Sequence, residues 1–172
     1  GRGTRFPGLV PNPSITGPDF LQLASDDFLF QTIRNGRPGR PMLPWGDRVN
    51  GFNDDEVRAV IAYIRRLGGN VQAQPDAKPQ LWATGDAALG ATLFASNCSG
   101  CHGKNGVGAD GPALNNRVFL SSVSDTFLVG TITRGRSGTV MQGFGDPSPI
   151  RRALTQAEVE SIVVYIRSLS AK

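Results

Sequence analysis

The chain has 172 residues, of which 39% are hydrophobic and 19% charged, a balance typical of a folded protein rather than a disordered one. Its net charge of +4 comes mostly from arginine, and the absence of a basic run or an aromatic platform argues against nucleic-acid binding. No stretch of eighteen apolar residues occurs, so no membrane span is predicted. The first residue is Gly1 rather than methionine, so we expect a processed chain or one that starts partway into a larger protein.

Two helices are predicted in residues 1–67. The first runs from about Asp26 to Asn35 and is stopped by Gly36, a residue that commonly ends helices. The second is the segment DEVRAVIAYIRRL, residues 55–67.

Residues 68–83 are predicted to form a linker rich in glycine, proline and alanine. Pro75 and Pro79 argue against a continuous helix here, because proline lacks the backbone donor that a helix interior needs. We expect Trp82 to pack against the domain that follows, with contact to a bound cofactor as the alternative.

The stretch NCSGCHGKNG, residues 97–106, holds both cysteines and the only histidine of the chain. Cys98, Cys101 and His102 form a C-x-x-C-H pattern, which indicates covalent attachment of a c-type haem. On a helical turn, positions i and i+3 face the same side, so both thiols can reach the two vinyl groups of one porphyrin. The imidazole of His102 would then lie under the ring and bind the iron.

Three other interpretations of this stretch compete with haem attachment. A redox C-x-x-C favours a βαβ context, whereas the surroundings here are predicted to be helical. A structural zinc site needs about four ligands, and two cysteines and one histidine do not supply them. A disulfide between residues three apart would be strained and would leave the histidine unexplained.

The segment from Thr84 to Leu169 resembles the small class I c-type cytochromes. Its leading helix, GDAALGATLFASNCSGCHG, has Gly90 and Phe94 where this family has a small residue and an aromatic one, both expected to face the last helix near Tyr165.

After the C-x-x-C-H pattern comes GADGPALNN, with Pro112 and Leu114. The resemblance implies that the backbone carbonyl of Pro112 accepts the proton on the second nitrogen of His102, which would fix the tautomer of the iron ligand. It also implies that Leu114 packs against a wall of the haem pocket.

The sixth iron ligand implied by the resemblance is Met141, in the loop RGRSGTVMQGFGDPSPI between two predicted helices. A loop methionine can also be a filler of gaps in the core, and this alternative stays open. Histidine and methionine together fill every coordination position, which favours an electron carrier over a catalyst.

Two further helices flank this loop. The first runs from about Asp125 to Arg134 and is stopped by Gly135. The second begins near Thr155, with Glu158 at the spacing of a capping box, and its apolar residues mark one helical face.

The two halves of the chain repeat one another. Residues 1–9 align with 106–114 at an offset of 105, residues 26–46 with 125–145 at an offset of 99, and residues 56–67 with 158–169 at an offset of 102. We therefore predict an all-α protein of tandem cytochrome c-like domains: residues 1–67 as the C-terminal part of one domain, then the linker, and residues 84–172 as a complete haem-binding domain.

The first copy begins where a C-x-x-C-H pattern would have ended, so its attachment segment is expected upstream of Gly1. Met42 aligns with Met141 and would bind the iron of a second haem. The alternative is a haem-free lobe in which Met42 only packs.

The resemblance implies an extracytoplasmic protein that passes single electrons between a donor and an acceptor protein. We expect it to be a subunit of a respiratory or photosynthetic complex or of a dehydrogenase, with membrane association through partners or a preceding segment left open. One rival is a haem enzyme with a displaceable axial ligand, such as a peroxidase or a sulfur-compound dehydrogenase. Another is a structural module without haem.

Overall fold

The computed structural model describes residue 3 and residues 14–37, 42–46, 51–73 and 80–171. Within these ranges every regular element is a helix and the extended residues form only isolated bridges, which confirms the predicted all-α class. No helix in the described part of the chain is long and apolar enough to cross a membrane. Pro75 and Pro79 of the linker, and Gly1, Pro7 and Leu9 of the first alignment block, lie outside the described residues.

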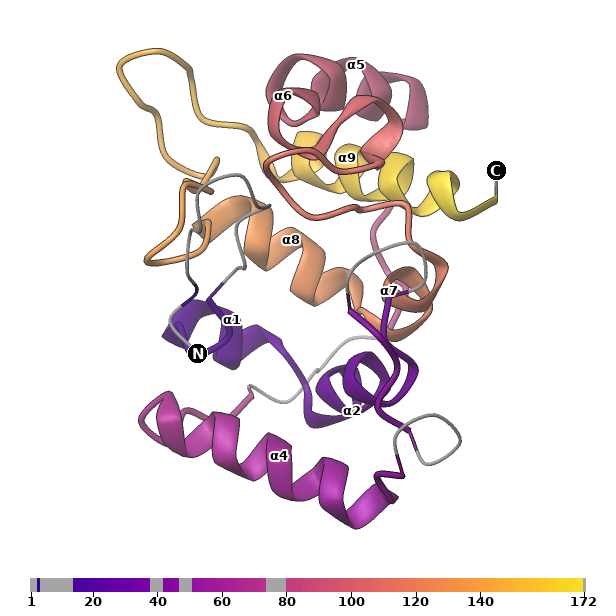
Figure 1. Cartoon of the computed structure of the whole chain (residues 1–172). Coiled ribbons are helices and arrows are strands. Elements are labelled where there is room, and N and C mark those ends of the chain that lie inside the picture. Colours follow the sequence, from indigo (N-terminus) through magenta and orange to yellow (C-terminus); the bar gives the residue numbers. More distant parts are fainter. Residues whose placement is uncertain (1–2, 4–13, 38–41, 47–50, 74–79, 172) are drawn as a thin grey trace.

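The first copy contributes α1 (Pro18–Leu23), α2 (Asp26–Asn35) and α4 (Asp54–Leu67). The second copy contributes α5 (Ala87–Asn97), α6 (Ser99–His102), the 3-10 turn η1 (Lys104–Gly106), α7 (Arg117–Ser122), α8 (Asp125–Arg134), α9 (Gln156–Ser168) and a final turn η2 (Leu169–Ala171). Figure 1 shows α5, α6 and α9 at one end of the molecule, α4 at the other, and α8, α1 and α2 between them.

Local sequence signals set the helix ends. The side chains of Ser25 and Ser124 accept hydrogen bonds at the starts of α2 and α8, and Thr155 forms a capping box with Glu158 at the start of α9. Both α2 and α8 end at a glycine with positive φ, at the positions predicted from the sequence.

The short helices α1 and α7 were not predicted from the sequence. Each has six residues, too few to show a helical period, and each ends two residues before the cap of the next helix. They are nevertheless equivalent elements, because Phe20 and Leu21 of α1 align with Phe119 and Leu120 of α7 at the offset of 99.

The same arginine clamp holds each copy together. Arg65 of α4 binds the carboxylate of Asp26 and the carbonyl oxygens of Leu21 and Ala24. Arg167 of α9 binds Asp125, Leu120 and Val123 in the same way. In both copies one guanidinium therefore donates to backbone carbonyls at the C-terminal end of the short helix, α1 or α7. The same guanidinium binds the carboxylate of the first residue of the next helix, α2 or α8.

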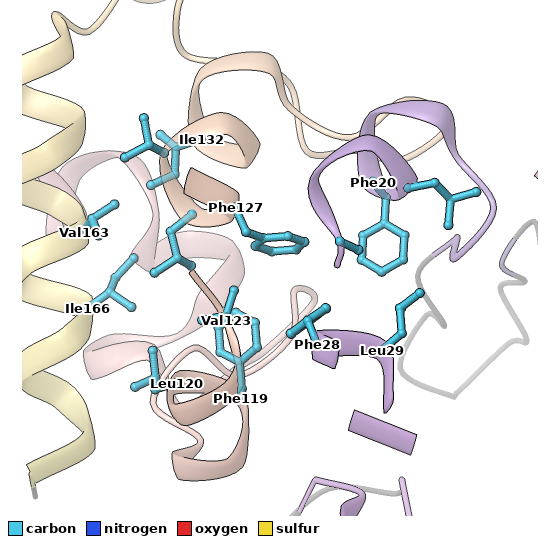
Figure 2. Close-up of a cluster of buried hydrophobic side chains, with 14 of the residues drawn as sticks. Phe20, Phe28, Leu29, Phe119, Leu120, Val123, Phe127, Ile132, Val163 and Ile166 are labelled. Atoms are coloured by element: carbon cyan, nitrogen blue, oxygen red, sulfur yellow. The ribbon is translucent and has the colours of Figure 1, made fainter. Parts of the chain in front are cut away.

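The two copies pack against each other through four phenylalanines, Phe20, Phe28, Phe119 and Phe127, which form equivalent pairs across the junction (Figure 2). Phe20 of α1 lies 5.9 Å from Phe127 of α8, and the aligned pair Phe119 of α7 and Phe28 of α2 lies at 6.1 Å. Phe28 and Phe127, which align with each other, meet at 4.9 Å. Such self-complementary pairing is the geometry of an isologous interface, formed here within one chain.

The leading helix α5 packs on α9 at the face predicted from the sequence. A Cβ atom at Gly90 would lie 2.0 Å from the carbonyl oxygen of Ser161, so only glycine permits this approach. Phe94 is buried, with its ring 5.3 Å from that of Tyr165. The packing of α5 on α9 fixes the position of the cysteine turn that follows α5.

Candidate functional site

Both cysteines and the histidine lie on one tight turn at the end of α5. The amides of Cys101 and His102 each donate to the carbonyl oxygen of Cys98, at 3.2 and 2.9 Å. Cys98 is half-buried and Cys101 exposed, and both thiols are free. Cys98 and Cys101 therefore lie on one helical turn, three positions apart, as the prediction requires.

The imidazole of His102 is buried, and its Nδ1 atom lies 2.9 Å from the carbonyl oxygen of Pro112. This is the hydrogen bond that the resemblance implied. Because a carbonyl can only accept, Nδ1 carries the proton and Nε2 is left as the nitrogen with a lone pair. Burial lowers the pKa of His102, although the bond to Pro112 opposes this shift, so the ring is held in the neutral form that binds metals.

The backbone folds tightly around this ring. The amide of Gly108 donates to the carbonyl of His102 at 2.6 Å, and the amide of Gly111 donates to the carbonyl of Cys101 at 2.7 Å. A Cβ atom at Gly111 would lie 3.0 Å from both Cε1 and Nδ1 of the imidazole. A side chain at position 111 would therefore press on the imidazole ring, a constraint that the sequence pattern alone does not reveal.

Leu114 lies at the end of the same loop, where its amide donates to the carbonyl of Gly106 at 2.8 Å. Its side chain is half-buried and packs against the hydrophobic core. This placement is compatible with the wall position implied for it.

Met141 lies in the loop between α8 and α9 and is half-buried. Its carbonyl accepts from the amide of Arg136, and its amide donates to the hydroxyl of Thr139. The loop then returns to α8, where Phe144 and Gly145 donate to the carbonyls of Ile132 and Thr133.

Met42 occupies the equivalent place in the first copy. Its carbonyl accepts from the amide of Arg37 at 2.9 Å, the same distance as between Arg136 and Met141. Trp45 and Gly46 donate to the carbonyls of α2 as Phe144 and Gly145 do to those of α8. The repeat in sequence is therefore also a repeat in loop geometry.

Trp82 packs against the second copy, as predicted. Its indole donates to the hydroxyl of Thr126 at 3.0 Å, and its amide and that of Ala83 donate to the carboxylate of Asp125. The role of Asp125 was missed at the sequence level, although its alignment with Asp26 was a usable signal.

The donor set of the turn fits a c-type haem. Two free thiols lie on one turn, the Nδ1 atom of the buried imidazole is bound to the carbonyl of Pro112, and Gly111 lies close against the ring. The described part of the chain contains no group of three or more His, Cys, Asp or Glu side chains that could hold a metal ion.

Residues 85–166 match the family described as cytochrome c oxidase, cbb3-type, subunit III. The cbb3-type cytochrome c oxidase subunit FixP of Bradyrhizobium sp. is 31% identical over 97% of this chain and 55% of its own length. The cbb3-type cytochrome c oxidase subunit CcoP of Cereibacter sphaeroides is 36% identical over the same shares. Cytochrome c-L of Methylorubrum extorquens is 38% identical over 46% of this chain and 38% of its own length.

The alignments to FixP and CcoP run through both copies of the repeat, whereas the alignment to cytochrome c-L spans 82 residues. This chain spans about half the length of the curated relatives that it matches.

Proposed function

Because the second half of this chain is a class I c-type cytochrome that carries covalently bound haem c, we propose that the protein passes single electrons between redox partners as a subunit of a respiratory complex. The observation that carries the proposal is the bond between His102 and Pro112 beside two free thiols on one turn. The haem supplies the one-electron chemistry, and the protein supplies ligands, burial and docking surfaces.

In this proposal Cys98 and Cys101 hold the haem by thioether bonds, and His102 and Met141 are the axial ligands. Pro112 keeps the proton of His102 on Nδ1, so the ring presents Nε2 in one orientation. Met141 fills the remaining position, which disfavours binding of a substrate to the iron. Leu114 and the buried core beside it exclude water from the site.

The first copy is proposed to be the distal part of a second haem domain, with Met42 as its axial ligand. The support is that residues at the end of α4 and the start of α2 are exposed where the aligned residues of the second copy are covered. Leu67 is 49% exposed, whereas the aligned Leu169 is 5% exposed. The side chain of Asp26 is 67% exposed, whereas that of Asp125 is 3% exposed beneath residues 82–83.

The occupant that fits these exposed positions is a helix like α5 with its own cysteine turn. Tyr63 aligns with Tyr165, which in the second copy contacts Phe94 of the leading helix. Tyr63 is itself exposed. Residues 1–67, 68–83 and 84–172 would then be the end of one haem domain, a linker and a second haem domain.

The partners proposed are other subunits of an oxidase complex, because the relatives that align across both copies are named as subunits of cbb3-type oxidases. We place the haem domains on the periplasmic side of the membrane, where c-type haem is attached. Membrane association would come from those partners or from a segment outside residues 1–172.

A pyridine haemochrome assay on purified protein, combined with mass spectrometry of peptides, tests the proposal. We expect a c-type spectrum and haem on the peptide that contains Cys98 and Cys101. In the natural full-length protein we expect a second haem peptide from upstream of the first copy. Protein without covalent haem would refute electron transfer, and a single haem in the full-length protein would refute the role given to Met42.

A further inference from the structure

The loop that carries Met141 begins at Arg136, which follows the glycine that ends α8. The side chain of Arg136 leaves its own copy and contacts the first one. Its Nη2 atom donates to the carbonyl of Ser14 at 2.5 Å, and its guanidinium carbon lies 4.4 Å from the ring centre of Phe20. A cation is attracted to an aromatic face, more strongly when the pair is partly withdrawn from water, and Phe20 is buried. Two groups of the first copy therefore hold Arg136.

The next residue of the loop also contacts the first copy. The amide of Ser137 donates to the carboxylate of Asp19 in α1 at 3.2 Å, and its hydroxyl donates to the same carboxylate. The start of the loop is therefore tied at two successive positions to α1 and to the segment just before it.

Both backbone polar groups of Met141 lead back to Arg136. The carbonyl of Met141 accepts directly from the amide of Arg136 at 2.9 Å. The amide of Met141 donates to the hydroxyl of Thr139 at 3.1 Å, and this hydroxyl donates to the carbonyl of Arg136 at 2.8 Å. The position of Met141 therefore follows that of Arg136, whose side chain is held by the first copy.

The first copy repeats this arrangement in the opposite direction. The amide of Arg37 donates to the carbonyl of Met42 at 2.9 Å, and its guanidinium carbon lies 4.6 Å from the ring centre of Phe119 in α7. Arg37 aligns with Arg136, and Phe20 with Phe119, at the offset of 99. Each methionine loop is thus linked through one arginine to the short helix of the other copy.

We propose that Arg136 is a positioning residue for Met141, and that the first copy is the platform against which it holds this methionine. The proposal rests on the proposed function, in which Met141 is the axial ligand of the haem. A contact that favours the ligated arrangement of the loop raises the concentration of a competing ligand that is needed to displace the methionine. The ligation of the haem in the second copy is then coupled to contacts made by the first copy.

The alternative is that Arg136 only holds the two copies together. Its loss would then lower the stability of the fold but leave the competition for the iron unchanged. Titration of the oxidised, haem-loaded chain with imidazole separates these roles, because imidazole competes with methionine for the iron.

The test uses the haem-loaded chain of residues 1–172 with Arg136→Gln, which loses the charge, and Arg136→Lys, which keeps it. Arg134→Gln is the matched control, because Arg134 is exposed in the last turn of α8. Phe20→Leu removes the ring beneath Arg136 without changing the loop, and Phe28→Leu is its control, because Phe28 is buried in the same cluster. Imidazole binding is followed at the Soret and red-edge bands, and thermal unfolding is recorded for each variant.

We expect the imidazole midpoint to fall about tenfold in Arg136→Gln and in Phe20→Leu, and Arg136→Lys to recover part of the loss. Arg134→Gln and Phe28→Leu should keep the wild-type midpoint, even where Phe28→Leu unfolds at as low a temperature as Phe20→Leu. An unchanged imidazole midpoint in Arg136→Gln would overturn the inference, whatever the thermal stability of that variant.

The Met141→Ala background separates this result from failure of the proposed function. If Arg136 acts through Met141, adding Arg136→Gln to Met141→Ala changes imidazole binding no further, as a double-mutant cycle requires of fully coupled residues. An effect of Arg136→Gln that persists without Met141 would contradict the positioning role. A wild type without the red-edge band would refute ligation by Met141 and this inference with it. A wild type with the band whose variants all bind imidazole equally would refute the positioning role alone.

Discussion

The Nδ1 atom of His102 lies 2.9 Å from the carbonyl oxygen of Pro112, ten residues further along the chain. The amides of Gly108 and Gly111 donate to backbone carbonyls of His102 and Cys101 within the same loop, and the hydrogen bond to the imidazole itself comes from a backbone carbonyl. Replacing the side chain of Pro112 therefore leaves the acceptor in place. A substitution that displaces the imidazole of His102 tests this hydrogen bond more directly.

Gly111→Ala is predicted to push the imidazole out of position. The new Cβ would lie 3.0 Å from two ring atoms and 3.1 Å from the carbonyl of Cys101, and overpacking of this kind costs about 1–3 kcal/mol. We expect a lower midpoint in urea, followed by absorbance, and a changed reduction potential. Gly100→Ala is the matched control, because nothing lies within 4 Å of its Cβ position. Equal behaviour of the two variants would contradict the close contact between Gly111 and the imidazole of His102.

The two pairs of arginine and aspartate, Arg65 with Asp26 and Arg167 with Asp125, are predicted to contribute different amounts to the free energy of unfolding although their sequences match. Asp125→Ala removes a buried partner of Arg167 and the acceptor for residues 82–83, and breaking a buried pair costs about 3–5 kcal/mol. Asp26→Ala removes a carboxylate that lies largely in water, so we expect a loss of only about 1 kcal/mol.

Urea unfolding of both aspartate variants, each compared with the wild type, measures this difference. Equal losses would show that the exposure of Asp26 has no energetic consequence.

The two thiols are predicted to react at different rates in chain produced without haem. Burial raises the pKa of Cys98 from 9.0 to about 11, with a smaller contribution from Cys101. The thiolate fraction of Cys98 at pH 8 is then about a hundredfold below that of an ordinary thiol, whereas Cys101 is exposed. Alkylation with iodoacetamide, followed by mass spectrometry, should label Cys101 first.

The raised pKa of Cys98 also makes the free energy of unfolding of the haem-free chain depend on pH. A raised pKa means that the folded state holds the proton of Cys98 more tightly than the unfolded state does. The resulting contribution to the free energy of unfolding is complete below pH 9 and is lost as the pH rises towards 11. In urea the two thiols should react at similar rates, and in haem-loaded protein neither should react. Faster labelling of Cys98 than of Cys101 in the folded haem-free chain would contradict the burial argument.

Much of the fold could be predicted from the sequence because its signals are local. Helix α2 and helix α8 begin at a serine cap and end at glycine, and both ends are visible in the repeat. The capping box of α9 and the contact of Gly90 with that helix followed from spacing and resemblance in the same way.

The contact between the two copies could not be predicted, because it depends on how elements meet in space. Phe20 and Phe119 align in the sequence, but the alignment does not indicate that Phe20 packs on α8 and Phe119 on α2. Their helices are also too short to show a period. Within the site, the pattern indicated His102 and Pro112, whereas the close approach of Gly111 to the imidazole depends on how the loop folds back in space.

The measurement that tests the central claim most directly is the absorption spectrum of the oxidised, haem-loaded chain, wild type against Met141→Ala. The claim is that haem held by Cys98 and Cys101 is ligated by His102 and Met141. We predict a weak band at the red edge of the spectrum, arising from iron–methionine bonding, that is present in the wild type and absent in the variant. A c-type spectrum whose red-edge band persists unchanged without the sulfur of Met141, or a wild type that lacks the band, would contradict this account.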